Sequence, residues 1–469
     1  MNRTTLLLSA AGLLALVALA LGLPKPPPTT DTTHTLAQPG EQEPTLTLPL
    51  ITSGEGALVL EGKLSGSYMQ TGPSEAFAVL EVKARQPQNQ HRVPVNVALV
   101  IDRSGSMRGQ KLDDAKKAAR EFVQRMTDVD RLALVHYGTS VTTFPSTLAT
   151  EEARARMLAF VDGIEDDGST NISGGMEAAA QELRPYVNQF RVSRAILLSD
   201  GQPTAGLVRE EELTALARQL RSQGIAVSAL GVGEDFNENL MQGVADQGGG
   251  FSGFLNSSQL AEVFTRELEQ ATNTVARSVE MRLTLPPQVT TAEVMGTNAY
   301  REGRTVRVPL YDMAGGQSAR LTVKLTLDLQ ASEQPLELLD AKVSYVDVEK
   351  DVPAEARVAL SARATDDAVL VRANLDKEVR VHAVRALGSQ QLRAAAEEMK
   401  KGNRTAALGF LGNARKLFGS SASALAGELA DVDRTQAAYE NAQDEAAQRD
   451  QARQLQKKTM KSFGLNNAY

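Results

Sequence analysis

Apolar residues between Asn96 and Ala271 come in short unbroken runs, separated by segments in which they recur every three or four positions. Unbroken runs are typical of strands buried on both faces, and the wider spacing predicts amphipathic helices. The expected strands are Val97 to Ile101, Leu132 to Tyr137, Ala195 to Ser199 and Ile225 to Val232, and the expected helices are Leu112 to Met126, Glu151 to Val161, Ile172 to Leu183 and Glu210 to Ser222. This alternation predicts a doubly wound, mostly parallel α/β sheet with its ligand site at the carboxyl ends of the strands.

Strict alternation of apolar and polar residues flanks this central region on both sides. The alternating segments are ALVLEGKL and AFAVLEVKA before residue 85, and SVEMRLTL, RTVRVPL, LTVKLTLDL and AKVSYVDV after residue 275. Alternation predicts antiparallel strands with one buried and one exposed face. Two arrangements fit: one β-sandwich built from both flanks with the central domain inserted into it or docked on it, or separate domains in a row.

After about Leu375 the chain is rich in Ala, Gln, Lys, Glu and Arg with helical periodicity, interrupted at Lys401-Gly402-Asn403 and at Gly419-Ser420. This pattern predicts two or three helices, a helical hairpin with a long last helix. The expected division of the chain is 1–23 signal peptide or membrane anchor, 24–45 disordered Pro/Thr-rich linker, 46–94 strands of the flanking sandwich, 95–272 central α/β domain, 273–365 β-sandwich and 366–469 C-terminal helices.

The first residues predict export. One arginine precedes a run without charge from Thr4 to Leu23, which ends at a proline cluster. Ala18-Leu19-Ala20 offers the small-residue pattern that signal peptidase accepts, yet the run is also long enough to cross a bilayer. A cleaved signal peptide and an uncleaved anchor therefore both fit, and both place the remaining chain outside the cytoplasm, in the periplasm or at the cell surface. This segment is the only expected contact with a membrane.

Composition narrows the chemistry of this 469-residue chain. A formal net charge of −7 argues against nucleic acid as a partner, because binding to phosphates needs a basic surface. The chain has no cysteine, which excludes disulfide scaffolds, thiolate metal sites and cysteine nucleophiles. Its four histidines are scattered along the sequence, so a polyhistidine zinc centre is not expected.

Oxygen-bearing side chains follow three separate segments of the expected parallel sheet. The first strand delivers Asp102, Ser104 and Ser106 at its carboxyl end, with Gly105 permitting a close turn. A second loop places Thr170 at the start of a helix, and another buried strand ends at Asp200. These segments share one edge of the sheet, and their hard oxygens suit Mg²⁺, Mn²⁺ or Ca²⁺ rather than zinc.

The DxSxS segment, the threonine of GSTNI and the aspartate of LLSDG together resemble the metal-ion-dependent adhesion site of von Willebrand factor A-type domains, as in integrins. The resemblance implies that Ser104, Ser106 and Thr170 contact a divalent cation, with Mg²⁺ preferred and Mn²⁺ or Ca²⁺ as alternatives. Asp102 and Asp200 would act directly or through bound waters while they orient the hydroxyls. The open metal position would accept a Glu or Asp carboxylate of a partner protein. Beyond this region the chain resembles exported bacterial A-domain proteins related to inter-α-trypsin-inhibitor heavy chains.

The expected function is therefore metal-dependent protein binding, in adhesion or complex assembly, and not catalysis. One alternative is a metal-dependent hydrolase that uses the same carboxylates; the near-site segments add only Asp166 and Asp167 to them, and a hydrolase also needs a base or nucleophile. The other alternative is a scaffold in which the A-type fold is only structural.

Four further features have structural interpretations. Asp113 and Asp114 are expected on the solvated face of a helix rather than in a second cation site, and His136 is expected to pack in or beside the core. The run from Gly248 to Gly250 is expected to be a loop, because it lacks the spacing of a phosphate cradle.

Overall fold

The computed structural model describes residues 51–53, 56–87, 92–233, 237–442 and 444–462. The predicted export segment and linker, residues 1–45, lie outside the described residues. Within the described ranges, no helix is both long and apolar enough to cross a bilayer.

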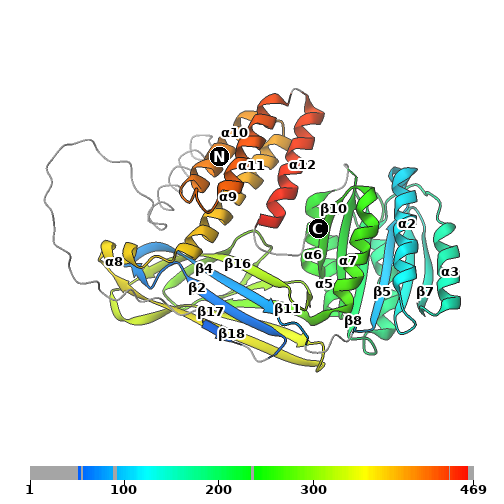
Figure 1. Ribbon diagram of the computed structural model, residues 1–469, viewed down its shortest axis with the longest axis horizontal. Coiled ribbons are helices and arrows are strands. Elements are labelled where there is room, and N and C mark those ends of the chain that lie inside the picture. Colours follow the sequence, from blue (N-terminus) through cyan, green and yellow to red (C-terminus); the bar gives the residue numbers. More distant parts are fainter. Residues whose placement is uncertain (1–50, 54–55, 88–91, 234–236, 443, 463–469) are drawn as a thin grey trace.

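The central domain is a six-stranded sheet in the order β10-β9-β8-β5-β6-β7, with helices on both faces (Figure 1). All neighbouring strands are parallel except the edge pair β6 and β7, which is antiparallel. Every residue of β5 is buried, as its unbroken apolar run predicts. The strands are β5 (Val95–Asp102), β6 (Arg131–Tyr137), β7 (Val141–Leu148), β8 (Val192–Ser199), β9 (Ile225–Val232) and β10 (Gly249–Leu255). The predicted doubly wound α/β fold is confirmed.

Two apolar cores lie between the sheet and its helices. One core is closed by α2, α3 and α7, and the other by α4, α5 and α6. The helices are α2 (Gln110–Arg125), α3 (Glu151–Asp162), α4 (Ile172–Leu183), α5 (Glu210–Ser222), α6 (Glu238–Gly248) and α7 (Leu260–Thr272). Side-chain caps begin several of them: Thr150 accepts a hydrogen bond from Ala153 N at 3.3 Å and starts α3.

The prediction of a loop at Gly248–Gly250 is wrong. Gly248 ends α6, and Gly249, with a φ of 72°, turns the chain directly into β10. Gly250 lies so close to β9 that a Cβ there would be 2.4 Å from the carbonyl oxygen of Val227. The glycines therefore make a tight helix-to-strand junction, which the sequence shows only as a break.

Strands from both flanks of the central domain build one β-sandwich. Its first sheet has the order β1-β2-β4-β16-β12, and its second has β13-β14-β11-β17-β18-β3 with β15 beside β11. Strands β4 and β16 are antiparallel neighbours from Gly72 opposite Leu329 to Lys83 opposite Ser318, so the central domain is inserted between them in the sequence. The strands are β1 (Ile51–Ser53), β2 (Leu58–Leu64), β3 (Tyr68–Gln70), β4 (Gly72–Ala84), β11 (Thr274–Thr284), β12 (Val289–Val294), β13 (Tyr300–Glu302), β14 (Thr305–Pro309), β15 (Met313–Ala314), β16 (Ser318–Leu329), β17 (Ser332–Asp347) and β18 (Val352–Thr365).

The C-terminal region differs from the predicted hairpin, because five helices follow β18 in the described residues. They are α8 (Ala368–Ala373), α9 (Lys377–Lys400), α10 (Arg404–Gly419), α11 (Ala426–Asn441) and α12 (Glu445–Ser462). Within these ranges α9, with 24 residues, is longer than α12, with 18. The predicted breaks do separate α9 from α10 and end α10. We refer to α9–α12 as the bundle.

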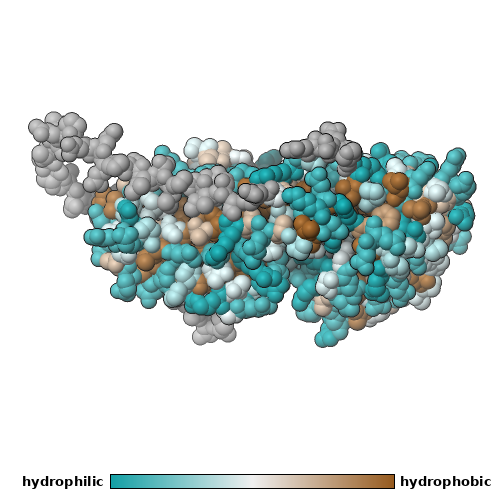
Figure 2. Space-filling model, turned by 90° about the horizontal axis from the view of Figure 1, so that it is seen from below, coloured by the Kyte–Doolittle hydropathy of each residue, from teal (hydrophilic) through white to brown (hydrophobic). Residues whose placement is uncertain are grey.

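The bundle contacts both other parts of the molecule. Phe77 of the sandwich is fully buried in the bundle core. On the central domain, Lys400 forms an ion pair with Glu238 of α6 at 3.1 Å. The view from below in Figure 2 shows hydrophilic residues over most of that face, with hydrophobic ones scattered among them, which is ordinary for a protein surface.

Candidate metal centre

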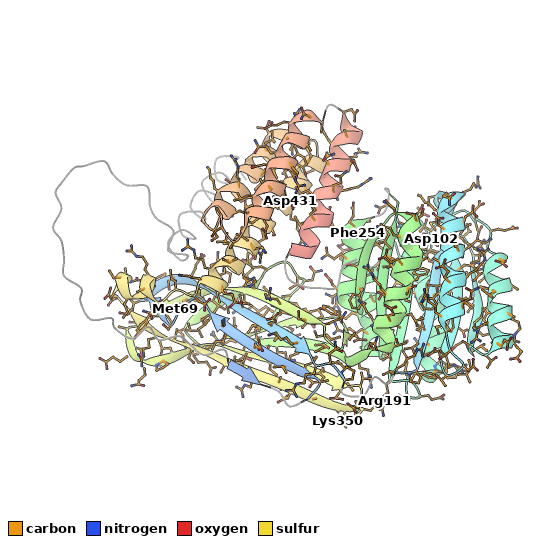
Figure 3. All side chains as sticks on the ribbon, in the orientation of Figure 1. Met69, Asp102, Arg191, Phe254, Lys350 and Asp431 are labelled. Atoms are coloured by element: carbon orange, nitrogen blue, oxygen red, sulfur yellow. The ribbon has the colours of Figure 1, made fainter. Side chains whose placement is uncertain are left out.

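Asp102, the last residue of β5, lies at the upper end of the central sheet in Figure 3, away from the sandwich. Its side chain is fully buried. One carboxylate oxygen accepts a hydrogen bond from Ser104 N at 2.8 Å, and the other accepts one from Ser199 Oγ at 2.6 Å. Both oxygens are therefore fixed, and the loop after β5 is folded back over the carboxylate.

The two serines of the DxSxS segment converge as predicted. A short 3₁₀ turn at Gly105–Met107 brings Ser104 Oγ to 3.1 Å from Ser106 Oγ. Ser106 Oγ also donates a hydrogen bond to Asp200 at 2.6 Å. Ser104 is buried and Ser106 is exposed, so the hydrogen-bonded hydroxyls lie at the boundary between the interior and the surface.

Thr170 faces the same position from the loop before α4. A Cβ on Gly201 would lie 3.5 Å from Ser106 Oγ and 3.6 Å from Thr170 Oγ1, so both hydroxyls border the space beside this glycine. The loop after β8 holds Thr170, because Thr170 N donates to Thr204 Oγ1 at 2.8 Å and Thr204 N donates to the Thr170 carbonyl at 3.0 Å. All five predicted residues therefore border one small region at the sheet edge.

Hydrogen bonds between the first two loops set their spacing. Gly105 N donates to the Gly168 carbonyl at 3.0 Å. The Arg103 guanidinium reaches the second loop and bonds Asp167 at 3.0 Å, while Asp167 N donates to the Arg103 carbonyl at 2.7 Å. The site is thus assembled from loops that are fixed to each other as well as to the sheet.

Burial dominates the electrostatics of Asp102. It raises the pKa of the Asp102 carboxyl, while hydrogen bonds from Ser104 and Ser199 oppose that rise and the nearby charge of Asp200 adds to it. Asp200 is also fully buried, and its second oxygen lies 2.5 Å from Lys111 Nζ. Two buried carboxylates at one sheet edge favour the presence of positive charge there.

The side chains present fit a divalent cation of the Mg²⁺ type. Three hydroxyls and two carboxylates supply hard oxygens, and the glycine at position 201 leaves the space between the hydroxyls free of side chain. Within the described part of the chain, no cluster of three or more His, Cys, Asp or Glu side chains could hold a metal.

The surroundings of Asp113, Asp114 and His136 fit their structural interpretations. Asp113 is exposed on α2, and Asp114 accepts hydrogen bonds from Gln110 and Ser257. His136 is buried on β6, where its ring lies 5.1 Å from that of Phe160.

Sequence reasoning missed three residues that support the centre. Ser199 directly precedes Asp200, so its position at the same strand end was available as a signal. Thr204 was not identified, because only the fold brings it beside the second loop. Lys111 belongs to the amphipathic pattern of α2 and carries no sequence signal of its contact with Asp200.

Comparison with known proteins gives the same picture of the central region. Residues 96–266 match the family model of the von Willebrand factor type A domain. The chain is 26% identical over 264 residues to the uncharacterized protein YfbK of Escherichia coli K12, a match that covers 54% of this chain and 45% of that protein. It is 30% identical over 203 residues to human inter-alpha-trypsin inhibitor heavy chain H3, covering 42% of this chain and 23% of H3. The chain thus matches less than half the length of either relative.

A solved structure extends the likeness beyond the central domain. The structure described as von Willebrand factor type A from Catenulispora acidiphila superimposes with a TM-score of 0.68 at 18% sequence identity, covering 87% of this chain and 96% of that one. A match of this extent includes the sandwich and helices as well as the central domain. At this identity it shows a shared fold.

Proposed function

Because residues 96–266 are a von Willebrand factor type A domain, we propose that this chain is a metal-dependent protein-binding protein that acts in adhesion or in the assembly of a complex. The observation that carries the proposal is the convergence of three loops at one sheet edge. These loops place the hydroxyls of Ser104, Ser106 and Thr170 beside the buried carboxylates of Asp102 and Asp200.

The donor set explains why such a site would bind a carboxylate. A Mg²⁺ ion bound through hydroxyls, with the two carboxylates acting directly or through waters, would keep several water-filled positions that a ligand can exchange. The bound ion would supply an acceptor for a Glu or Asp carboxylate of the partner protein. This chain's own residues hold and orient the donors: Asp102 fixes the loop of Ser104, and Asp200 accepts the hydrogen bond of Ser106.

The near-site acids support binding over hydrolysis. Asp166 is paired with Arg108 at 2.6 Å, and this contact lowers the pKa of the Asp166 carboxyl. Asp167 accepts hydrogen bonds from Ser140, which lower its pKa, and it also pairs with Arg103. A general base is most effective when its pKa lies near the working pH, so these acids are poor candidates for that role. Among these acids, the role of general base for an activated water would then fall to Asp102 or Asp200.

The experiment is a calorimetric titration of the full chain with Mg²⁺ and Mn²⁺. We expect Asp102→Ala to abolish measurable metal binding, because it removes the carboxylate that fixes the first loop. Thr170→Ala keeps both carboxylates and is expected to weaken the binding of a glutamate-containing peptide more than it weakens metal binding. Asp113→Ala, an exposed aspartate on α2, is the matched control and should bind metal like the wild type.

The same proteins distinguish the alternatives. Peptide binding that needs metal, is lost in EDTA and is lost when the glutamate is replaced by glutamine supports the proposal. Full binding by Asp102→Ala, or by the wild type in EDTA, would leave the domain as a scaffold. Metal-dependent cleavage of the peptide would establish the hydrolase.

We also propose that the site acts outside the cytoplasm, on the strength of the uncharged run from Thr4 to Leu23. A fusion of residues 1–40 to a reporter should be exported, and its fractionation with or without membranes decides between anchor and cleaved signal. A reporter that stays in the cytoplasm contradicts export.

A further inference from the structure

Lys111 places a positive charge at the edge of the candidate metal centre. It is the second residue of α2, and its ammonium lies 2.5 Å from Asp200 Oδ2 and 3.3 Å from the carbonyl oxygen of Ser106. Asp200 is fully buried, and the Lys111 side chain is only 28% exposed. The ammonium is therefore a counter-charge for a carboxylate that has little access to water.

The fold provides a slot for this lysine. The end of its side chain lies over Gly233, just after β9, where a Cβ would come within 3.0 Å of Lys111 Cε and 3.2 Å of Nζ. Gly233 also has a φ of 82°, a conformation that side chains other than glycine rarely adopt. The position of the ammonium is thus set by three elements: α2, the end of β8 and the turn after β9.

We propose that Lys111 is a tethered competitor of the metal, which neutralises Asp200 in the metal-free protein and so sets the affinity of the centre for divalent cations. The inference rests on the proposed metal-binding function and adds its regulation by a residue outside the ligand set. Binding of the cation becomes an exchange of counter-charges at Asp200, in which the lysine gives up its contact with Oδ2.

Removing the lysine charge has opposite effects on the stability of the metal-free and the metal-bound protein. The metal-free protein loses the partner of a buried carboxylate, which is destabilising. The metal-bound protein loses a positive charge next to the divalent cation, which is stabilising because charges in a partly buried site are poorly screened. Both effects act in the same direction on metal affinity, and we expect at least about a tenfold decrease in the Kd for Mg²⁺.

The test compares Lys111→Met with Lys117→Met by calorimetric titration with Mg²⁺ on the full chain. Lys117 is an exposed lysine of the same helix, so its replacement controls for the change in overall charge. Lys111→Gln provides a second neutral variant that retains a hydrogen-bond donor, in case the methionine variant is poorly folded. We expect both Lys111 variants to bind Mg²⁺ about tenfold more tightly and the Lys117 variant to match the wild type.

Melting temperatures provide an independent readout. In EDTA the Lys111 variants should melt below the wild type, and saturating Mg²⁺ should close or reverse that difference. If the wild type binds metal and the Lys111 variants bind it with equal or weaker affinity, the inference is overturned and the proposed function stays intact. The same holds if the Lys117 variant gains as much metal affinity as the Lys111 variants. Absence of metal binding in every protein overturns the proposed function and this inference together.

Discussion

The protonation of His136, inside the central domain, makes the stability of the folded protein depend on pH. The side chain is 8% exposed, packs against Phe160, and has a buried Nδ1 without a hydrogen-bond partner. Burial, assisted by the charge of Arg103, lowers its pKa to about 4 from an ordinary value near 6.5. Between these values the unfolded chain binds a proton that the folded protein does not, so stability must fall as the pH falls. The loss from this residue is about 2 kcal/mol between pH 7 and pH 5, and about 3 kcal/mol once both states are protonated.

Urea unfolding followed by circular dichroism at pH 7 and pH 5, in EDTA, tests this magnitude. The wild type should lose about 2 kcal/mol more than His136→Phe, which keeps a ring against Phe160 and cannot take up a proton. The variant serves as the baseline, since it retains every carboxylate that also titrates in this range. Parallel pH dependence of the two proteins, or an NMR titration midpoint for His136 near 6.5, would refute the reasoning.

Three further predictions concern packing and the site. Gly201→Ala should fold normally, because its Cβ meets the two nearest hydroxyls at ordinary contact distance, yet it should lower Mg²⁺ affinity in calorimetry by filling the space beside them. Arg194→Met should cost about 3–5 kcal/mol in urea unfolding, since it leaves the fully buried Glu267 without the guanidinium 3.2 Å away. Phe77→Ala should cost about 3–5 kcal/mol and expose the bundle to limited proteolysis, whereas Lys400→Met, which breaks a partly exposed ion pair, should cost no more than about 1 kcal/mol.

The fold class and the grouping of the site residues were predictable for one shared reason. Parallel strands bring their carboxyl ends to the same edge, so motifs at the ends of β5 and β8 had to meet once the strands were identified. The alternating flanks likewise predicted antiparallel strands, and the long pairing of β4 with β16 shows that, of the two arrangements allowed by the pattern, they form one sandwich. Local hydrophobic patterns were sufficient to predict these strands because each pattern repeats along the whole strand.

The features that sequence reasoning missed depend on contacts between distant segments. Strand β7 contains Pro145, which argues against a strand, and the proline is accommodated because β7 lies at the sheet edge. Helix α9 buries mainly small residues, including Ala383, Ala386 and Ala395, so its buried face resembles that of a solvated alanine-rich helix. The contact of Lys111 with Asp200 spans 89 positions and arises only from the crossing of α2 over the end of β8.

The direction of the strands explains how the central domain can be firmly attached while the candidate site stays accessible. Arg191, just before β8, donates to the Val348 carbonyl of the sandwich at 2.7 Å, and Figure 3 shows Arg191 beside Lys350 at the end of the domain opposite Asp102. Eight extended residues separate the two ends of β8, about 25 Å. The sandwich therefore holds the amino ends of the strands, and a partner that binds as proposed approaches the carboxyl ends without meeting it. The bundle lies closer to the site than the sandwich does. Its Lys400 pairs with Glu238 at the start of α6. The preceding residue, Asn237, has its side-chain amide 3.4 Å from Gln202 Oε1, in the loop that follows Asp200.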